Sequence, residues 1–213
     1  ITEQYRALKT NLATLHADQP PKSIVMTSAR AGEGKTISAL NLAITLADDK
    51  DARVVVVDAD LRTPSVHRRF GIDNQRGLSD YLSGSVMLEV VLQRSRLVNL
   101  SLLPSGRLPG SPGELLASKK MDDLLTRFTR DYDHVVIDVV IVRQAAIGRR
   151  VVRVGVSAET THQQVGTELT KEEVVAVVTA EVVVVLIADE DVRQAVTVDE
   201  IGPGAHKYGR GEG

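Results

Sequence analysis

The chain has 213 residues, 43% of them apolar, and a formal net charge of −2. This length and composition predict one domain, or less readily two small ones, with a sizeable core. The absence of cysteine excludes disulfides, thiolate metal sites and a cysteine nucleophile, while the net charge and an aromatic content of 3% argue against nucleic acid as a partner.

The first predicted element is a helix over residues 2–17, in which Tyr5, Leu8 and Leu12 recur at helical spacing. An apolar run with β-branched residues predicts a buried strand at 23–28. Apolar positions between 37 and 47 predict the next helix. Four consecutive valines within residues 53–58 are typical of a parallel strand covered on both faces.

Further strands are predicted at 99–103 and 134–138, with a helix between them that carries the apolar residues from 115 to 128. This alternation predicts an α/β fold, a mostly parallel sheet with helices on both faces. The valine-rich remainder predicts strands at 151–156 and 182–188 around a helix at 161–175.

The organisation predicted from these elements is a single domain over residues 1–213. Residues 1–20 contain a possible oligomerisation helix, and 195–213 form a flexible tail. An amphipathic helix in place of a signal peptide, and an apolar stretch at 174–188 too short to span a bilayer, predict a soluble, cytoplasmic chain. Any membrane contact is expected to come through a partner or a missing segment.

A phosphate-binding loop is predicted between the strand at 23–28 and the helix after it. Its residues are Ala31, Gly32, Glu33, Gly34, Lys35 and Thr36. The glycines let backbone N–H groups curve around phosphate oxygens, and the helix N-terminus adds partial positive charge. Lys35 can reach the phosphates of ATP, and the Thr36 hydroxyl can bind Mg²⁺. Because Ala29 stands where the general pattern has glycine, a chance glycine turn is the alternative.

Three acidic residues follow predicted parallel strands: Asp58, Asp60 and Asp138. Ligands of open α/β sheets lie beyond the carboxyl ends of the strands. Carboxylates there can hold Mg²⁺ together with phosphate and water, and one can accept a proton from an attacking hydroxyl. The alternative is that these acids only cap the turns that follow.

With these motifs, the sequence resembles the cytoplasmic domain of bacterial tyrosine kinases, P-loop autokinases that regulate capsule and exopolysaccharide export. The resemblance covers residues 1–138 and includes the phosphate loop at 28–36, the D-x-D-x-R segment at 55–62, and segments 77–79 and 103–116. It implies that Lys35 and Thr36 bind phosphate and Mg²⁺. It also implies that Asp58 and Asp60 are catalytic and metal-binding residues, either being the base, and that Asp138 is the third acid.

The chain departs from this family at two places near the predicted phosphate site. Ala31 replaces a usual proline, and residues 139–141 replace Thr-Pro-Pro after the third acid. Arg30 stands where related partitioning and septum-site ATPases carry a signature lysine, which favours the kinase branch of these deviant P-loop proteins.

The resemblance also concerns assembly. Glu3, Arg6 and Lys9 lie on one helical stripe, where the family has an E-x-x-R-x-x-R pattern for subunit contacts in a ring; a solvated helix face is the alternative. Tyr208 lies in a glycine-rich end and is the expected phosphate acceptor.

Two functions therefore remain open. The first is an ATP- and Mg²⁺-dependent protein-tyrosine autokinase of capsule or exopolysaccharide synthesis. Its partners would be other copies of the chain, a membrane-embedded activator and tyrosine-containing proteins. The second is a nucleotide-switched assembly or partitioning-type ATPase with no protein substrate, which would share every phosphate-binding residue.

Overall fold

The computed structural model describes residues 2–14, 22–28 and 33–139, and the backbone of four strands further along the chain. The described helices are α1 (Thr2–Thr14), α2 (Lys35–Ala47), α3 (Val66–Phe70), α4 (Leu78–Leu82), α5 (Leu88–Val91), α6 (Pro112–Leu116) and α7 (Lys119–Asp131). The described strands are β1 (Ser23–Ser28), β2 (Val54–Asp58), β3 (Gln93–Arg94), β4 (Leu100–Leu103), β5 (His134–Asp138), β6 (Ala145–Ile147), β7 (Arg150–Val152), β8 (Glu173–Val178) and β9 (Val182–Ala188).

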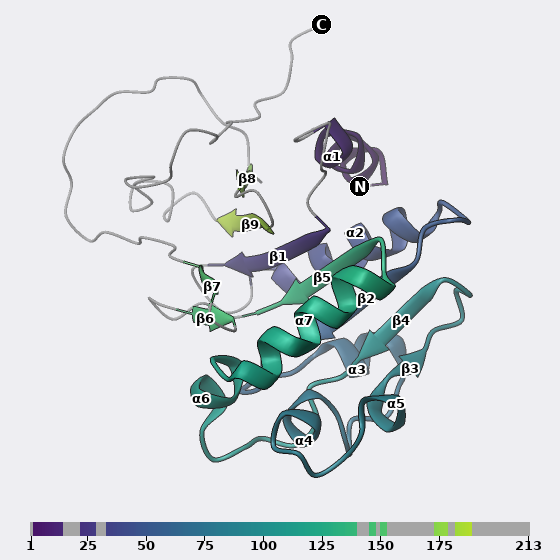
Figure 1. Ribbon diagram of the computed structural model, residues 1–213. Coiled ribbons are helices and arrows are strands. Elements are labelled where there is room, and N and C mark those ends of the chain that lie inside the picture. The colour runs from purple at the N-terminus through teal and green to yellow at the C-terminus, as the bar shows by residue number, and fades with distance from the viewer. Residues whose placement is uncertain are drawn as a thin grey trace, which may run out of the picture.

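Seven of these strands form one sheet in the order β3-β4-β2-β5-β1-β9-β8. Strands β4, β2, β5, β1 and β9 run parallel, and β3 and β8 pair antiparallel at the two edges. In Figure 1, α7 lies in front of this sheet and α2 behind it. The expected mostly parallel sheet with helices on both faces is confirmed.

The valine strand β2 shows why helices cover both faces. Successive side chains of a strand point to opposite faces. Val54 and Val56 accordingly pack into the core cluster that contains α2, and Val55 and Val57 into the cluster that contains α7. All four valines are fully buried, as the sequence predicted.

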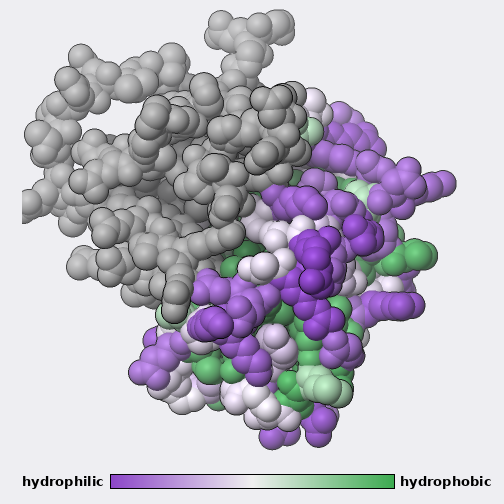
Figure 2. All heavy atoms as spheres, viewed as in Figure 1, coloured by the Kyte–Doolittle hydropathy of each residue, from purple (hydrophilic) through white to green (hydrophobic). Residues whose placement is uncertain are grey.

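Helix α7 covers its face of the sheet with an amphipathic pattern. Met121, Leu124, Leu125 and Phe128 are buried, and the opposite side of the helix is hydrophilic (Figure 2). The prediction of one helix from 115 to 128 is wrong. Ser118 Oγ accepts a hydrogen bond from the backbone N–H of Met121 and so begins α7 as a helix separate from α6.

The region after Val139 differs most from the prediction. Residues 173–175, expected at the end of a helix, begin strand β8, which pairs antiparallel with β9. Their β-branched neighbours favour this pairing over a helix. The strand expected at 182–188 is confirmed as β9, beside β1. Of the strand expected at 151–156, the described part lies in β7. Residues 153–156, 161–172 and 195–213 lie outside the described residues.

Helix α1 packs against α2 through Leu12, which is buried, and Tyr5 and Leu8, which are partly buried. Among the residues described, no helix combines the length and the apolar character needed to cross a bilayer.

Candidate nucleotide-binding site

A left-handed glycine leads from the phosphate loop into α2. Gly34 has φ 90°, a conformation that favours glycine, and its carbonyl accepts a hydrogen bond from the N–H of Ser38 at 2.9 Å. Lys35 and Thr36 therefore occupy the first turn of α2. Of the other predicted loop residues, Glu33 lies at this turn, half-buried. Ala31 and Gly32 lie outside the described residues.

The parallel pairing of β2 with β5 brings the predicted acids together. The register places Asp58 beside Asp138 at the carboxyl ends of the two strands. Both residues are fully buried, and Asp60 is 4% exposed. The carboxyl edge of the sheet thus gathers three carboxylates at the start of α2.

Lys35 is held by two of these carboxylates. Its Nζ lies 2.8 Å from Asp60 Oδ2 and 3.2 Å from Asp138 Oδ1. Burial acts to lower the pKa of Lys35, but Asp138 and Asp60 outweigh it and the pKa is raised. The ammonium group is therefore charged and serves as the counter-ion of the acids.

The pKa values of Asp60 and Asp138 move in opposite directions. Burial acts to raise the pKa of Asp60, but hydrogen bonds from Lys35 and Thr63 outweigh it and the pKa is lowered. Thr63 donates from both its backbone N–H, at 2.9 Å, and its hydroxyl, at 3.0 Å. For Asp138, burial prevails over Lys35 and the pKa is raised.

Asp58 is an acid whose pKa lies near neutrality. Its Oδ1 accepts a hydrogen bond from the N–H of Asp60 at 3.3 Å, and its Oδ2 one from the N–H of Val66 at 3.1 Å. Burial, with repulsion from Asp138, raises its pKa to about 7. Asp58 can therefore exchange a proton near neutral pH.

The raised pKa of Asp58 predicts that the stability of the folded domain depends on pH. A carboxyl whose pKa is raised by folding destabilises the folded state once it is charged. Relative to Asp58→Asn, the wild-type domain should therefore lose on the order of 1–3 kcal/mol of unfolding free energy between pH 5 and pH 8. Chemical denaturation at both pH values measures this. Asparagine has one oxygen and so loses one of the two hydrogen bonds that Asp58 accepts. This loss costs the same at pH 5 and pH 8, so it cancels when the change with pH is compared between the two proteins.

Asp51→Asn, at an exposed acid, is the matched control. Parallel pH profiles for the wild type and Asp58→Asn would show that Asp58 does not titrate in this range.

Two residues of the site escaped the sequence analysis. Thr63 holds Asp60, as described above, and Ser65 Oγ donates a hydrogen bond to Thr36 Oγ1 at 3.1 Å. Both lie just beyond the acidic motif. Asp60 and Thr63 are close in sequence, and an Asx-type turn is a local signal that could have indicated their contact. Ser65 and Thr36 are far apart in sequence and are brought together only by the fold.

The donor set suits Mg²⁺. Asp138 Oδ2 is buried and accepts no hydrogen bond within the described part of the chain, and Thr36 and Asp58 add oxygen atoms nearby. Mg²⁺ prefers such oxygen ligands, with phosphate and water completing its shell. No group of three or more His, Cys, Asp or Glu in that part of the chain is arranged to hold a metal by itself. A cation held jointly with phosphate fits better.

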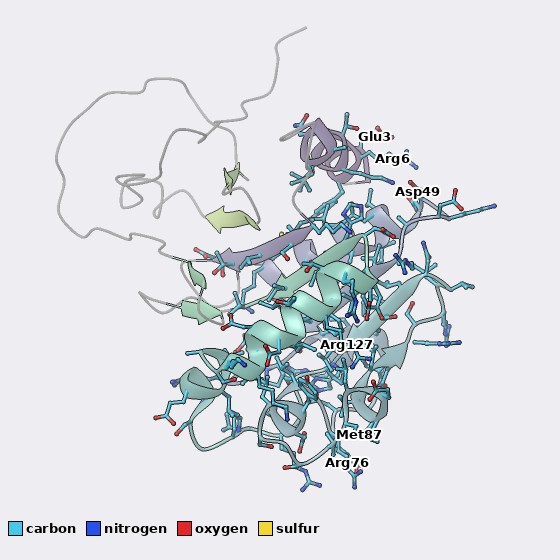
Figure 3. All side chains as sticks on the ribbon, viewed as in Figure 1. Glu3, Arg6, Asp49, Arg76, Met87 and Arg127 are labelled. Carbon is cyan, nitrogen blue, oxygen red and sulfur yellow. The ribbon has the colours of Figure 1, made fainter. Side chains whose placement is uncertain are left out.

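The predicted interface stripe is divided between solvent and the contact of α1 with α2. Arg6 and Glu3 form an exposed ion pair of 2.9 Å on α1 (Figure 3). Lys9 instead donates a hydrogen bond to the carbonyl of Thr45 in α2 at 3.3 Å. Glu3 and Arg6 are thus placed where a second molecule could reach them, whereas Lys9 also helps to attach α1. Tyr208 lies outside the described residues.

A parallel sheet whose carboxyl edge gathers acids around the lysine of a glycine turn defines a P-loop nucleotide-binding protein. Comparisons with known proteins agree. The AAA domain family matches residues 21–146. Tyrosine-protein kinase YwqD of Bacillus subtilis (strain 168) is 40% identical over 137 residues, which are 64% of this chain and 57% of that protein.

Two solved structures are also similar. The kinase domain of Escherichia coli tyrosine kinase ETK superimposes with a TM-score of 0.62 at 33% identity, covering 65% of this chain and 54% of that one. The VpsO kinase domain has a TM-score of 0.57 at 33% identity, covering 65% of this chain and 69% of that one. The chain therefore belongs to the AAA-domain family of P-loop proteins, on the branch that contains the bacterial tyrosine kinases. It spans little more than half the length of YwqD.

Proposed function

We propose that this chain is the catalytic part of an ATP-dependent protein-tyrosine autokinase. The observation that carries the proposal is the cluster of Lys35 with Asp58, Asp60 and Asp138 at the end of the glycine turn, in a chain of the tyrosine-kinase branch. ATP would bind with its phosphates at the start of α2, where Lys35 exchanges its carboxylate partners for phosphate oxygens.

In the proposed reaction, a tyrosine hydroxyl oxygen forms a bond to the γ-phosphorus, and the bond from that phosphorus to the bridging oxygen of ADP breaks. The phenolic proton passes to a carboxylate. Asp58 is better suited than Asp60 to accept it, because the pKa of Asp58 is about 7 and that of Asp60 is lowered. Mg²⁺, held by Thr36 and Asp138 with Asp58 beside them, would neutralise charge on the phosphates.

The proposal extends to partners and location. The relatives include a putative tyrosine-protein kinase CapB of Staphylococcus aureus and a kinase of the cps region of Klebsiella pneumoniae. We propose a role in capsule or exopolysaccharide synthesis, at the inner face of the plasma membrane, with a membrane-embedded activator and protein tyrosines as substrates.

The test is incubation of the purified chain with ATP labelled at the γ-phosphate, followed by phosphoamino-acid analysis and mass spectrometry. We expect phosphotyrosine, chiefly at Tyr208 and strongly reduced in Tyr208→Phe. Tyr132→Phe is the control, because Tyr132 is part of the packed fold and donates a hydrogen bond to Ser101. Hydrolysis of ATP without phosphotyrosine would favour a nucleotide-driven assembly ATPase instead.

If Asp138 helps to bind Mg²⁺, its substitution should change the Mg²⁺ requirement of turnover. Asp138→Asn removes a charge from the expected Mg²⁺ site, so the Mg²⁺ concentration giving half-maximal turnover should rise about tenfold or more. Turnover measured against Mg²⁺ concentration tests this, with Asp133→Asn, at the opposite end of β5, as the control. An unchanged Mg²⁺ requirement would remove Asp138 from the metal site.

The exposed pair on α1 makes a prediction about assembly. If Arg6 contacts another subunit, Arg6→Glu places two like charges on the contact and should lower the mass of the particle in light scattering. Arg96→Glu makes the same charge change at an exposed turn elsewhere. A wild-type chain that is monomeric at high concentration, with and without MgATP, would contradict the ring.

A further inference from the structure

The hydroxyl expected to bind Mg²⁺ has a partner in a different element. Ser65 Oγ donates to Thr36 Oγ1 over 3.1 Å. The next residue, Val66, begins α3 and donates its N–H to Asp58 Oδ2 at 3.1 Å. The loop at 60–66 therefore joins the first turn of α2 to the acid at the end of β2.

Helix capping does not explain this serine. Ser65 occupies the N-cap position of α3, but its side chain makes no capping hydrogen bond. Its hydroxyl is turned instead to Thr36, which is itself buried with 9% of its surface exposed. The contact thus joins a buried hydroxyl of Thr36 to a partly buried hydroxyl of Ser65.

The chemistry of a hydroxyl shows what the contact does. The Thr36 hydroxyl has one proton and two lone pairs. The hydrogen bond from Ser65 occupies one lone pair. The neighbouring Asp138, whose pKa the Thr36 hydroxyl acts to lower, is the natural acceptor for the proton. One lone pair is left for a ligand, and the hydrogen bond from Ser65 limits the directions in which it can point.

We infer that Ser65 is a positioning residue that orients the Thr36 hydroxyl toward the Mg²⁺ of bound nucleotide. The inference rests on the proposed nucleotide site, and it adds a residue that acts on the metal through another side chain. Ser65 touches neither nucleotide nor cation. Its loss therefore weakens the metal-dependent part of binding and leaves the metal-free part intact.

The experiment is calorimetric titration of ATP with Mg²⁺ and with EDTA, on the wild type, Ser65→Ala and Ser65→Thr. The gain in affinity that Mg²⁺ provides should fall about fivefold in Ser65→Ala, the value of one neutral hydrogen bond. It should return in Ser65→Thr, which restores a hydroxyl, and affinity in EDTA should be equal in all three. Ser111→Ala is the matched control, because Ser111 is also an N-cap serine without a side-chain capping bond.

Two results would overturn the inference: a full Mg²⁺ gain in Ser65→Ala, or a loss in Ser65→Thr as large as that in Ser65→Ala. A wild-type chain whose ATP affinity does not respond to Mg²⁺ would overturn the proposed function as well. A wild type that responds while Ser65→Ala responds equally would overturn the positioning role alone.

Discussion

Lys35→Met should lower the affinity for ATP on the order of 100-fold, because charged hydrogen bonds to phosphate are among the strongest in proteins. The structure adds a second effect on the ligand-free protein. Removal of the ammonium leaves Asp60 and Asp138 buried without their cation, and breaking a buried pair costs about 3–5 kcal/mol. Calorimetry with ATP and denaturation without it measure the two effects separately.

The stability deficit of Lys35→Met should depend on pH. Lys35 acts to lower the pKa of both Asp60 and Asp138, so its removal raises both, and a buried carboxyl whose pKa is raised destabilises the fold more as the pH rises and it becomes charged. The deficit should therefore be larger at pH 8 than at pH 5. Lys22→Met is the control, because Lys22 is exposed and donates to the carbonyl of Thr129, at the opposite end of β1. An unchanged ATP affinity in folded Lys35→Met would contradict the site.

Gly77→Ala should destabilise the domain by about 3 kcal/mol, at the upper end of what an overpacked methyl group costs. A Cβ at Gly77 would collide with the carbonyl oxygen of Pro104 and the N–H of Gly106, both backbone atoms. The cause is space alone, since φ of −170° is open to any residue. Leu78 donates to the Pro104 carbonyl at 2.8 Å, and this contact would have to open. Thermal unfolding of the ligand-free chain measures the effect.

Gly110→Ala is the matched control, because nothing lies within 4 Å of its added Cβ. It should change the unfolding free energy by less than about 0.5 kcal/mol. Equal unfolding temperatures for the two variants would mean that the loops around Gly77 and Gly106 separate at little cost.

The elements that sequence predicted best are those in which every local signal agrees. In β1 and β2, a short apolar run rich in β-branched residues predicts a buried strand, and β1 is followed by a glycine turn and β2 ends in an acid; the structure places both strands as expected. The break between α6 and α7 was missed because the apolar residues on both sides of Ser118 were assigned to one helical pattern. The strand at β8 was missed because valines fit helical spacing and strand pairing alike.

The residues of the site likewise include some whose proximity could be predicted from sequence and some whose proximity could not. Asp58 and Asp138 could be expected to meet, since both end parallel strands. Their adjacency in register, however, depends on β2 and β5 being direct neighbours, although 75 residues lie between the end of β2 and the start of β5. The contacts of Lys35 with the acids, and of Ser65 with Thr36, join the first turn of α2 to a strand end and to the loop at 60–66, which lie far from it in the sequence. Local sequence cannot reveal them.

The pairing of Asp58 with Asp138 makes the geometry of the proposed nucleotide site depend on the hydrophobic core. Neighbouring strands lie about 4.8 Å apart, so the pairing of β2 with β5 sets the distance between the backbones of the two acids. A slip of β2 by a single residue would turn Asp58 to the opposite face and exchange the valines between the two cores. The relative position of the two acids is therefore determined by the packing of the β2 valines in the two core clusters. The spacing of these two acids therefore cannot change without a change in the packing of the interior.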